Sequence, residues 1–95
     1  MSTIVIVRHE VADYSIWRAG FNEHIKEAPK HGFTAVTVLR DTENPNAVTV
    51  MLQAQDQKVA KAFLASDVLR DMMKKEGVIG EPQINYLSDV TRSSQ

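Results

Sequence analysis

The chain has 95 residues, which is enough for one small domain with a modest hydrophobic core. Its formal net charge of −1 argues against a nucleic-acid or membrane surface, and it has no cysteine for a disulfide or a thiolate-based site. No apolar run approaches the roughly 18 residues of a membrane span, and no basic segment followed by an apolar one marks a signal peptide, so we expect a cytoplasmic protein.

The first predicted elements are a strand and an amphipathic helix. Thr3 to His9 is rich in β-branched residues, which is typical of a strand. A turn is expected over residues 10–12, and the Asp13 carboxylate can then cap a helix by accepting from its first free backbone N–H groups. The helix should kink or end near Ala28, because Pro29 lacks a backbone N–H and disfavours helical geometry in the residue before it.

The rest of the chain predicts a hairpin, two helical segments and a last strand. Strands over residues 33–40 and 47–54 flank a turn cluster of Asp, Asn and Pro, which indicates an antiparallel hairpin. Asp56 and then Ser66 are candidate N-caps, so we expect a second helix, a break and a third helix. The last predicted strand covers residues 83–87.

The element order β-α-β-β-α-β is that of the split βαβ, or ferredoxin-like, arrangement, which is an α+β fold. Right-handed crossovers place both helical layers on one face of a single antiparallel sheet. The sequence contains no internal repeat and no domain boundary, so residues 1–90 are expected to form a single domain. The polar residues 91–95 are expected to be a disordered tail.

The second face of the sheet has no helix to cover it, yet it is also rich in apolar residues. Ile4 and Ile6 point to one side of the first strand while Val5 and Val7 point to the other, and both hairpin strands show a similar pattern. A contiguous apolar patch of this size is unusual on a monomer. We therefore expect a homodimer through the open sheet face; the alternative is that the β-branched residues reflect strand propensity alone.

One stripe of the first helix carries the candidate functional residues. At 100° per residue, Tyr14, Trp17, Phe21 and His24 share a narrow, otherwise apolar face. His24 is the candidate catalytic residue, because an imidazole between helix and sheet can exchange a proton near neutral pH. The alternative is a structural histidine held by a hydrogen bond. The three aromatic residues are candidate substrate-binding walls for a small aromatic or apolar ligand, or else ordinary core.

The remaining polar residues predict less chemistry. His9, at the end of the first strand, is expected to be solvated, and the alternative is that it meets the mouth of the pocket. His31 suits a helix C-terminus without a functional role. Arg40 and Asp41 are expected to form an ion pair at the end of the hairpin. The three histidines lack metal-ligand spacing, so no metal site is expected.

Several motifs are spaced along nearly the whole domain. They are Val11-x-Asp13-Tyr14-x-x-Trp17-x-x-x-Phe21-x-x-His24, Arg40-Asp41, Asn44-Pro45-Asn46, Ala62-Phe63-Leu64-Ala65-Ser66 and Gly77-Val78-x-Gly80-x-Pro82. Together they resemble the dimeric α+β barrel superfamily, and within it the small proteins grouped with antibiotic-biosynthesis monooxygenases and polyketide cyclases. The resemblance implies a dimeric α/β barrel with a pocket between helices and sheet in each protomer. It also implies chemistry without metal or flavin, because a bound phenolic or quinol substrate carries the reactive electrons.

On this resemblance we expect a small-molecule enzyme of the cofactor-independent monooxygenase or cyclase type, with His24 as the proton acceptor or donor and no cofactor. Its expected substrate is compact and largely apolar or aromatic. Haem chemistry is disfavoured, because the first strand lacks the asparagine, and residues 56–76 lack the histidine, that haem-degrading members use. Two alternatives stay open: a non-catalytic ligand-binding or stress-response module, and a scaffold whose only interface is the dimer.

Overall fold

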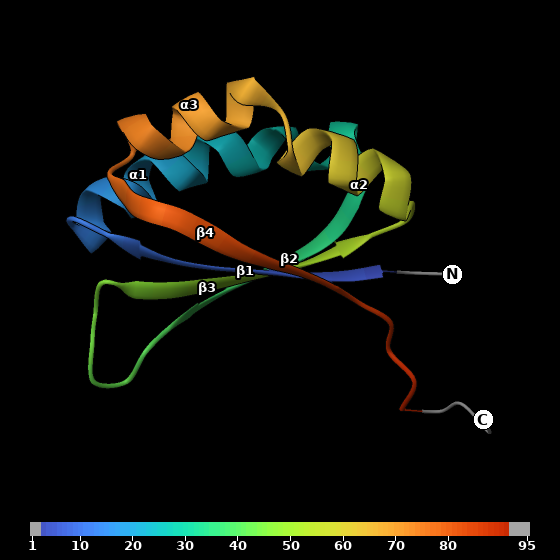
Figure 1. Cartoon of the computed structure of the whole chain (residues 1–95), viewed down its shortest axis with the longest axis horizontal. Coiled ribbons are helices and arrows are strands. Elements are labelled where there is room, and N and C mark those ends of the chain that lie inside the picture. Colours follow the sequence, from blue (N-terminus) through green and yellow to red (C-terminus); the bar gives the residue numbers. More distant parts are fainter. Residues whose placement is uncertain (1–2, 92–95) are drawn as a thin grey trace.

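A four-stranded antiparallel sheet with two rows of helices on one face forms the structure, a computed structural model that describes residues 3–91 (Figure 1). The elements are β1 (Thr3–Val11), α1 (Tyr14–His24), the 3₁₀-helix η1 (Ile25–His31), β2 (Phe33–Arg40), β3 (Ala47–Ala54), α2 (Gln57–Leu64), α3 (Asp67–Lys75) and β4 (Val78–Leu87). This α+β, ferredoxin-like architecture is the one that the sequence predicts. Most of the predicted disordered tail, residues 92–95, lies outside the described residues.

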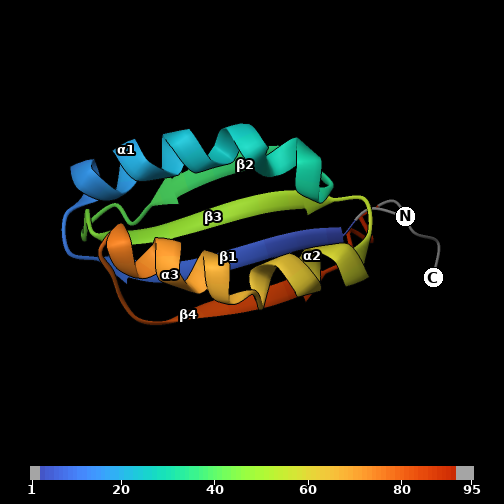
Figure 2. The same cartoon turned by 90° about the horizontal axis from the view of Figure 1, so that it is seen from above.

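The strand order is β2-β3-β1-β4, and β1 lies between β3 and β4. Val7 is opposite Val50 of β3 and Ile84 of β4, which places these three side chains on one face of the sheet. Seen from above, α1 lies on the β2–β3 side of this face, while α3 and α2 lie over β1 and β4 (Figure 2). The two rows of helices therefore run side by side over the same face.

The first helical row begins at the predicted cap and changes geometry before its proline. The Asp13 carboxylate accepts from the Ile16 N–H at 3.2 Å. After His24 the chain tightens into the 3₁₀-helix η1, which contains Pro29. Pro29 cannot donate to a carbonyl four residues earlier, so the α-helical ladder cannot continue through it. Gly32, with φ of 83°, ends the row in the left-handed region that favours glycine.

The second helical row is broken where the sequence predicts. Asp56 caps α2 by accepting from the N–H groups of Lys58 and Val59. The Ser66 hydroxyl donates to the Phe63 carbonyl at 2.7 Å and accepts from the Leu69 N–H at 3.3 Å, so it closes α2 and caps α3. The break allows the row to bend over the twisted sheet.

Two strand boundaries differ from the prediction. β1 continues to Val11, and β4 begins at Val78 rather than at Gln83, because Val11 and Val78 pair across the two strands. The predicted turn over residues 10–12 is therefore wrong for its first two positions. The register of this pair shifts between Arg8 and Glu10, and such an irregularity lets the paired strands continue where strict alternation fails.

The hydrophobic core lies between the sheet and the helices. Its buried side chains come from β1 and β3 above all, with Trp17 from α1, Ala28 from η1, Phe33 from β2 and Ala60 from α2 completing it. The opposite face of the sheet is not covered by any element of the described chain, and apolar side chains such as Ile4, Ile6 and Met51 keep part of their surface exposed there. Within residues 3–91, no helix combines the length and apolar character that a membrane span requires.

Candidate functional site

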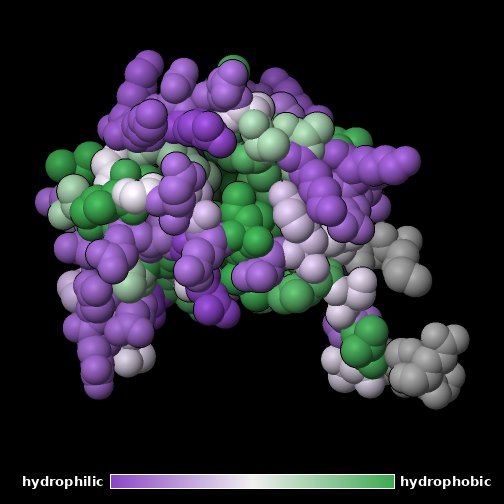
Figure 3. Space-filling model, viewed as in Figure 1, coloured by the Kyte–Doolittle hydropathy of each residue, from purple (hydrophilic) through white to green (hydrophobic). Residues whose placement is uncertain are grey.

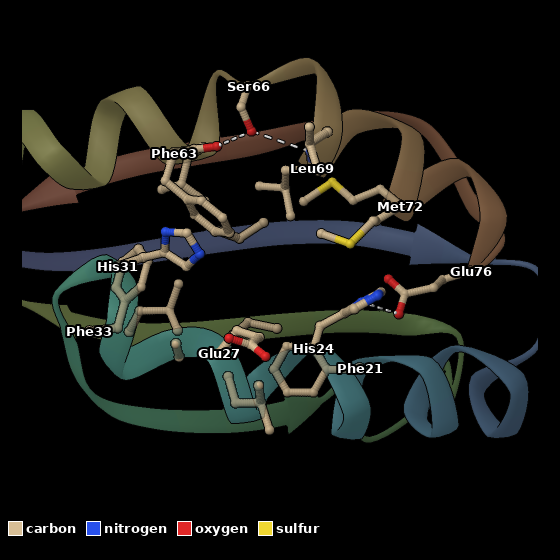
Figure 4. Close-up of a pocket in the computed structure, with 18 of the residues that line it drawn as sticks. Phe21, His24, Glu27, His31, Phe33, Phe63, Ser66, Leu69, Met72 and Glu76 are labelled. Carbon is tan, nitrogen blue, oxygen red and sulfur yellow. Dashed lines mark hydrogen bonds and ion pairs between the residues drawn. The ribbon is translucent and has the colours of Figure 1, made fainter.

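A cavity of about 420 Å³ lies between the two helical rows and the sheet (Figure 4). This volume falls within the range of about 300–1,000 Å³ that is usual for small-molecule sites. Most of the lining is apolar and comes from every helix and from β1, β2 and β3. The polar side chains in the lining are His9, His24, Glu27, His31, Ser66 and Glu76. In the space-filling view, a group of hydrophobic residues is visible in the middle of this face, bordered by hydrophilic residues (Figure 3).

The predicted stripe of α1 forms one wall of this cavity. Trp17, Phe21 and His24 all belong to the lining, and Trp17 is 2% exposed. The Trp17 and Phe21 rings stack with their centroids 4.8 Å apart. Their spacing of three to four residues places these side chains on one helix face, which is the geometry that the sequence predicts.

Tyr14, the first residue of the predicted stripe, is not part of the cavity lining. Its N–H donates to Oδ1 of Asn46 at 3.2 Å, and the Arg40 guanidinium lies 4.0 Å from the centroid of its ring. Tyr14 stands at the very start of α1, so its ring lies beyond the end of the cavity and against the β2–β3 hairpin. The prediction that Tyr14 contacts a ligand is therefore not supported for this cavity.

The predicted ion pair between Arg40 and Asp41 is also replaced by other contacts. Arg40 Nε donates to the Pro45 carbonyl at 3.1 Å. The Asp41 carboxylate accepts from the backbone N–H groups of Glu43 and Asn44, at 3.0 and 2.8 Å. The turn thus uses both side chains to satisfy its own backbone, as Asp commonly does in turns.

His24 is paired with a carboxylate that the sequence analysis did not single out. Its Nδ1 lies 2.9 Å from Oε2 of Glu76, the residue that follows α3, and the two side chains are 38% and 11% exposed. The distance is that of an ion pair, while the N–H direction falls short of hydrogen-bond alignment. We infer from the short distance that the two groups interact, because a small rotation of either side chain would align the hydrogen bond. Such contacts also often tighten when a ligand binds.

Burial shifts the pKa of the Glu76 carboxyl. Removal from water raises its pKa above the ordinary value, and the neighbouring His24 ring opposes this with a smaller lowering effect. The lining therefore holds an acidic group and an imidazole next to each other at one end of an apolar cavity. Perturbed carboxyls beside an imidazole are frequent at sites that move protons.

His9 is the second imidazole of the cavity, where it is half-buried rather than fully solvated as the sequence favours. Its ring packs edge-on against Trp17 with the centroids 5.4 Å apart, and its Nδ1 is buried without a hydrogen-bond partner among the described residues. Burial lowers the pKa of His9 below its ordinary value, so the neutral ring is favoured. The strand continues past His9, and this keeps the side chain on the helix-covered face.

His31 lies at the other end of the cavity. Its ring stacks on Phe63 with the centroids 4.1 Å apart, and Phe63 in turn meets Phe33 edge to face at 5.8 Å. Figure 4 shows this aromatic group opposite the end that holds His24 and Glu76. All three histidines of the chain therefore line one cavity, although they are far apart in the sequence.

The other polar groups of the lining are committed elsewhere. Glu27 lies 2.8 Å from Lys30, and this contact lowers the pKa of its carboxyl. The Ser66 hydroxyl is occupied by its two backbone hydrogen bonds. In the part of the chain from residue 3 to 91, no group of three or more His, Asp or Glu side chains is placed to hold a metal ion. The His24–Glu76 pair is thus the polar centre best placed to act on a ligand.

Comparison with known proteins shows what fold surrounds this cavity. No family model and no curated protein sequence matches the chain. A Bordetella bronchiseptica protein with the provisional name antibiotic biosynthesis monooxygenase matches with a TM-score of 0.80 at 18% identity, over 94% of this chain and 97% of that one. SnoaB, a cofactor-independent oxygenase from Streptomyces nogalater, matches with a TM-score of 0.77 at 12% identity, over 99% and 98% of the two chains.

Rv0793 from Mycobacterium tuberculosis matches with a TM-score of 0.72 at 13% identity, over 99% of this chain and all of that one. Identities this low show a shared fold and no more. The chain therefore has the fold of the antibiotic-biosynthesis-monooxygenase-like proteins, as the motif resemblance predicts.

Glu76 was missed because a glutamate near the end of a helix is usually a solvated surface residue. One signal for it was present in the sequence. Gly20 stands in the middle of a predicted amphipathic helix, where glycine lowers helix propensity and often has a packing reason. That signal indicates a close approach to the helix and does not name the group that approaches.

Proposed function

We propose that this chain is a small-molecule enzyme of the cofactor-independent monooxygenase or cyclase type. Its proposed substrate is a compact, largely apolar aromatic compound that binds between the helices and the sheet. The observation that carries the proposal is the His24–Glu76 pair at one end of an apolar cavity of about 420 Å³. The shared fold with SnoaB, a cofactor-independent oxygenase, supports the class of reaction.

His24 is the proposed proton acceptor. A carboxylate beside Nδ1 favours the neutral tautomer with the proton on Nδ1, which leaves Nε2 as the basic atom. A phenol, or a methylene activated by neighbouring carbonyl and aryl groups, loses its proton to such a base when held within hydrogen-bond reach. The side chains of Trp17 and Phe21 both line the cavity and provide an apolar wall against which an aromatic substrate packs.

The deprotonated substrate supplies the electrons of the proposed oxygenation. A carbanion formed at an activated methylene reduces O₂ and forms a carbon–oxygen bond, and the resulting peroxide takes a proton back from His24. The hydroperoxide then loses water and leaves a carbonyl. One CH₂ group and one O₂ are consumed, and one C=O group and one water are formed, so no external reductant is needed. In the cyclase variant the same carbanion attacks a carbonyl of its own molecule.

The test is an oxygen-consumption assay on a panel of hydroquinones, naphthols and aryl ketones with an activated methylene. We expect turnover by the wild-type chain that a metal chelator leaves unchanged. His24→Gln should fold normally and lose about 10²- to 10⁴-fold in rate, the usual range for a lost acid–base group. Tyr14→Phe is the matched control, because Tyr14 is on the same helix but outside the cavity lining.

The outcomes separate the alternatives. A folded His24→Gln variant with wild-type turnover would overturn the role of His24. Calorimetric binding of the same compounds without turnover or oxygen consumption would instead favour a non-catalytic ligand-binding module. If compounds neither bind nor react, the remaining interpretation is a scaffold whose function lies in its interfaces.

A further inference from the structure

The Glu76 side chain is largely buried, which is unusual for a glutamate. It is 11% exposed, lies just after the end of α3, and reaches across the cavity end to α1, which belongs to the other helical row (Figure 4). Glutamate is rarely buried unless it is paired. Its Oε2 lies 2.9 Å from Nδ1 of His24. The carboxylate therefore joins the two helical rows at the candidate base.

Gly20 makes room for this carboxylate. It lies one turn before His24 on α1, and a Cβ at position 20 would run into the carboxylate of Glu76 and lie 2.8 Å from its Cγ, closer than real Cβ contacts come. The φ of Gly20 is not positive, so the backbone conformation does not require glycine there. Glycine at position 20 therefore leaves the space that the Glu76 side chain occupies, and a larger residue there would displace that side chain.

His24 is the only titratable group of the cavity lining that lies beside Glu76. The other titratable groups of the cavity lining are His9 on β1 and Glu27 and His31 on η1. Glu27 is paired with Lys30, and His31 lies against Phe63 at the opposite end. The lining residues that come from α2, β2 and β3 contain no titratable side chain.

We propose that Glu76 is a positioning residue for His24. Its carboxylate packs against Gly20 and holds the His24 ring with Nδ1 toward the carboxylate and Nε2 toward a bound substrate. This inference rests on the proposed function, in which Nε2 takes the proton. The substrate proton then bonds to Nε2, the Nδ1 proton stays in place, and the ionised carboxylate stabilises the imidazolium that forms. The arrangement follows the logic of a base oriented by a buried acid.

The first experiment reads the tautomer of His24 and does not need a substrate. In ¹⁵N NMR of the full chain at a pH where the ring is neutral, we expect the Nδ1–H tautomer to dominate in the wild type. Glu76→Gln should shift the population toward the Nε2–H form. Gly20→Ala should produce the same shift while keeping the carboxylate, because the added methyl displaces Glu76. Glu23→Gln, an exposed substitution on α1 away from the pair, is the control and should change nothing.

The second experiment uses the substrate found in the assay above. Glu76→Gln should lower kcat by about 100-fold with little change in KM, because a misplaced base loses reactivity without losing substrate contacts. Glu76→Asp keeps a carboxylate beside His24 and should recover part of the rate that Glu76→Gln loses.

Either of two results would overturn the proposal: the same His24 tautomer in wild type and Glu76→Gln, or a Glu76→Gln enzyme with wild-type kcat. If the wild type turns over none of the compounds, the proposed function fails, and the NMR result alone then decides whether Glu76 positions His24. If Glu76→Gln does not fold, Gly20→Ala provides the same test, because it displaces the Glu76 carboxylate without removing it. An unchanged His24 tautomer in Gly20→Ala would then overturn the proposal.

Discussion

A single aspartate on the open face of the sheet tests whether two copies of the chain pack through that face. Ile6 lies in the middle of the face, opposite Met51 of β3 and Asn85 of β4, and keeps part of its surface exposed. We propose that a second copy covers this face. Ile6→Asp would then bury a carboxylate in the interface, whereas in a free protomer the same carboxylate reaches water.

The expected size follows from the symmetry of a homodimer, because each substitution is present twice. An uncompensated buried charge costs about 3 kcal/mol or more, so two of them weaken the dimer by about 6 kcal/mol. At about 1.4 kcal/mol per tenfold, this raises the dimer Kd by about 10⁴-fold. Sedimentation velocity at micromolar concentration should therefore show a dimer for the wild type and no dimer for Ile6→Asp.

Ile16→Asp is the matched control for this substitution. Ile16 is 63% exposed on α1, away from the sheet, so the same chemical change there should leave the dimer mass unchanged. The wild-type melting temperature should also rise with protein concentration, because a dimer is stabilised by mass action. A wild-type chain that sediments as a folded monomer at micromolar concentration, or an Ile6→Asp variant that keeps the dimer mass, would refute the reasoning.

Two further predictions concern the cavity. Binding of a small aromatic compound should quench the fluorescence of Trp17, the single tryptophan, because this ring lines the cavity; calorimetric binding without a fluorescence change would place the ligand elsewhere. Burial lowers the pKa of His9 from its ordinary 6.5, so the unfolded chain binds the extra proton more tightly and stability should fall as the pH drops below about 6.5. His9→Phe should flatten this fall in urea denaturation at about pH 7.5 and about pH 5.5, and an unchanged pH dependence would show that His9 is not buried.

Local sequence signals predicted the elements well wherever one residue controls a helix end or a turn. Asp13, Asp56 and Ser66 each cap the helix that they were expected to cap, because a short oxygen-bearing side chain satisfies the free N–H groups of the first turn. The hairpin strands also begin and end at the predicted residues. These features depend on contacts within a few residues, and a single sequence shows such contacts directly.

The features that the sequence did not predict depend on contacts between distant segments. β4 begins early because Val78 finds a partner in Val11, and the two residues are far apart along the chain. His9 is half-buried because the covering helix brings Trp17 over it. Helical periodicity placed His24 on the inner face of α1, but no periodicity shows that the end of α3 brings Glu76 to the same point. The sequence therefore predicted His24 from helical periodicity, whereas Glu76 joins the site through tertiary packing.

The alternation of β1 connects the two proposals and also keeps them separable. Val5, Val7 and His9 face the helices, while Ile4 and Ile6 face the open side, so neighbouring residues of one strand serve the cavity and the proposed dimer interface in turn. No residue of the open face belongs to the cavity lining. A cavity built from one protomer alone does not need the partner to complete its walls. A monomeric Ile6→Asp chain that stays folded should therefore keep its ligand site, so loss of the dimer and loss of the site are two separate observations.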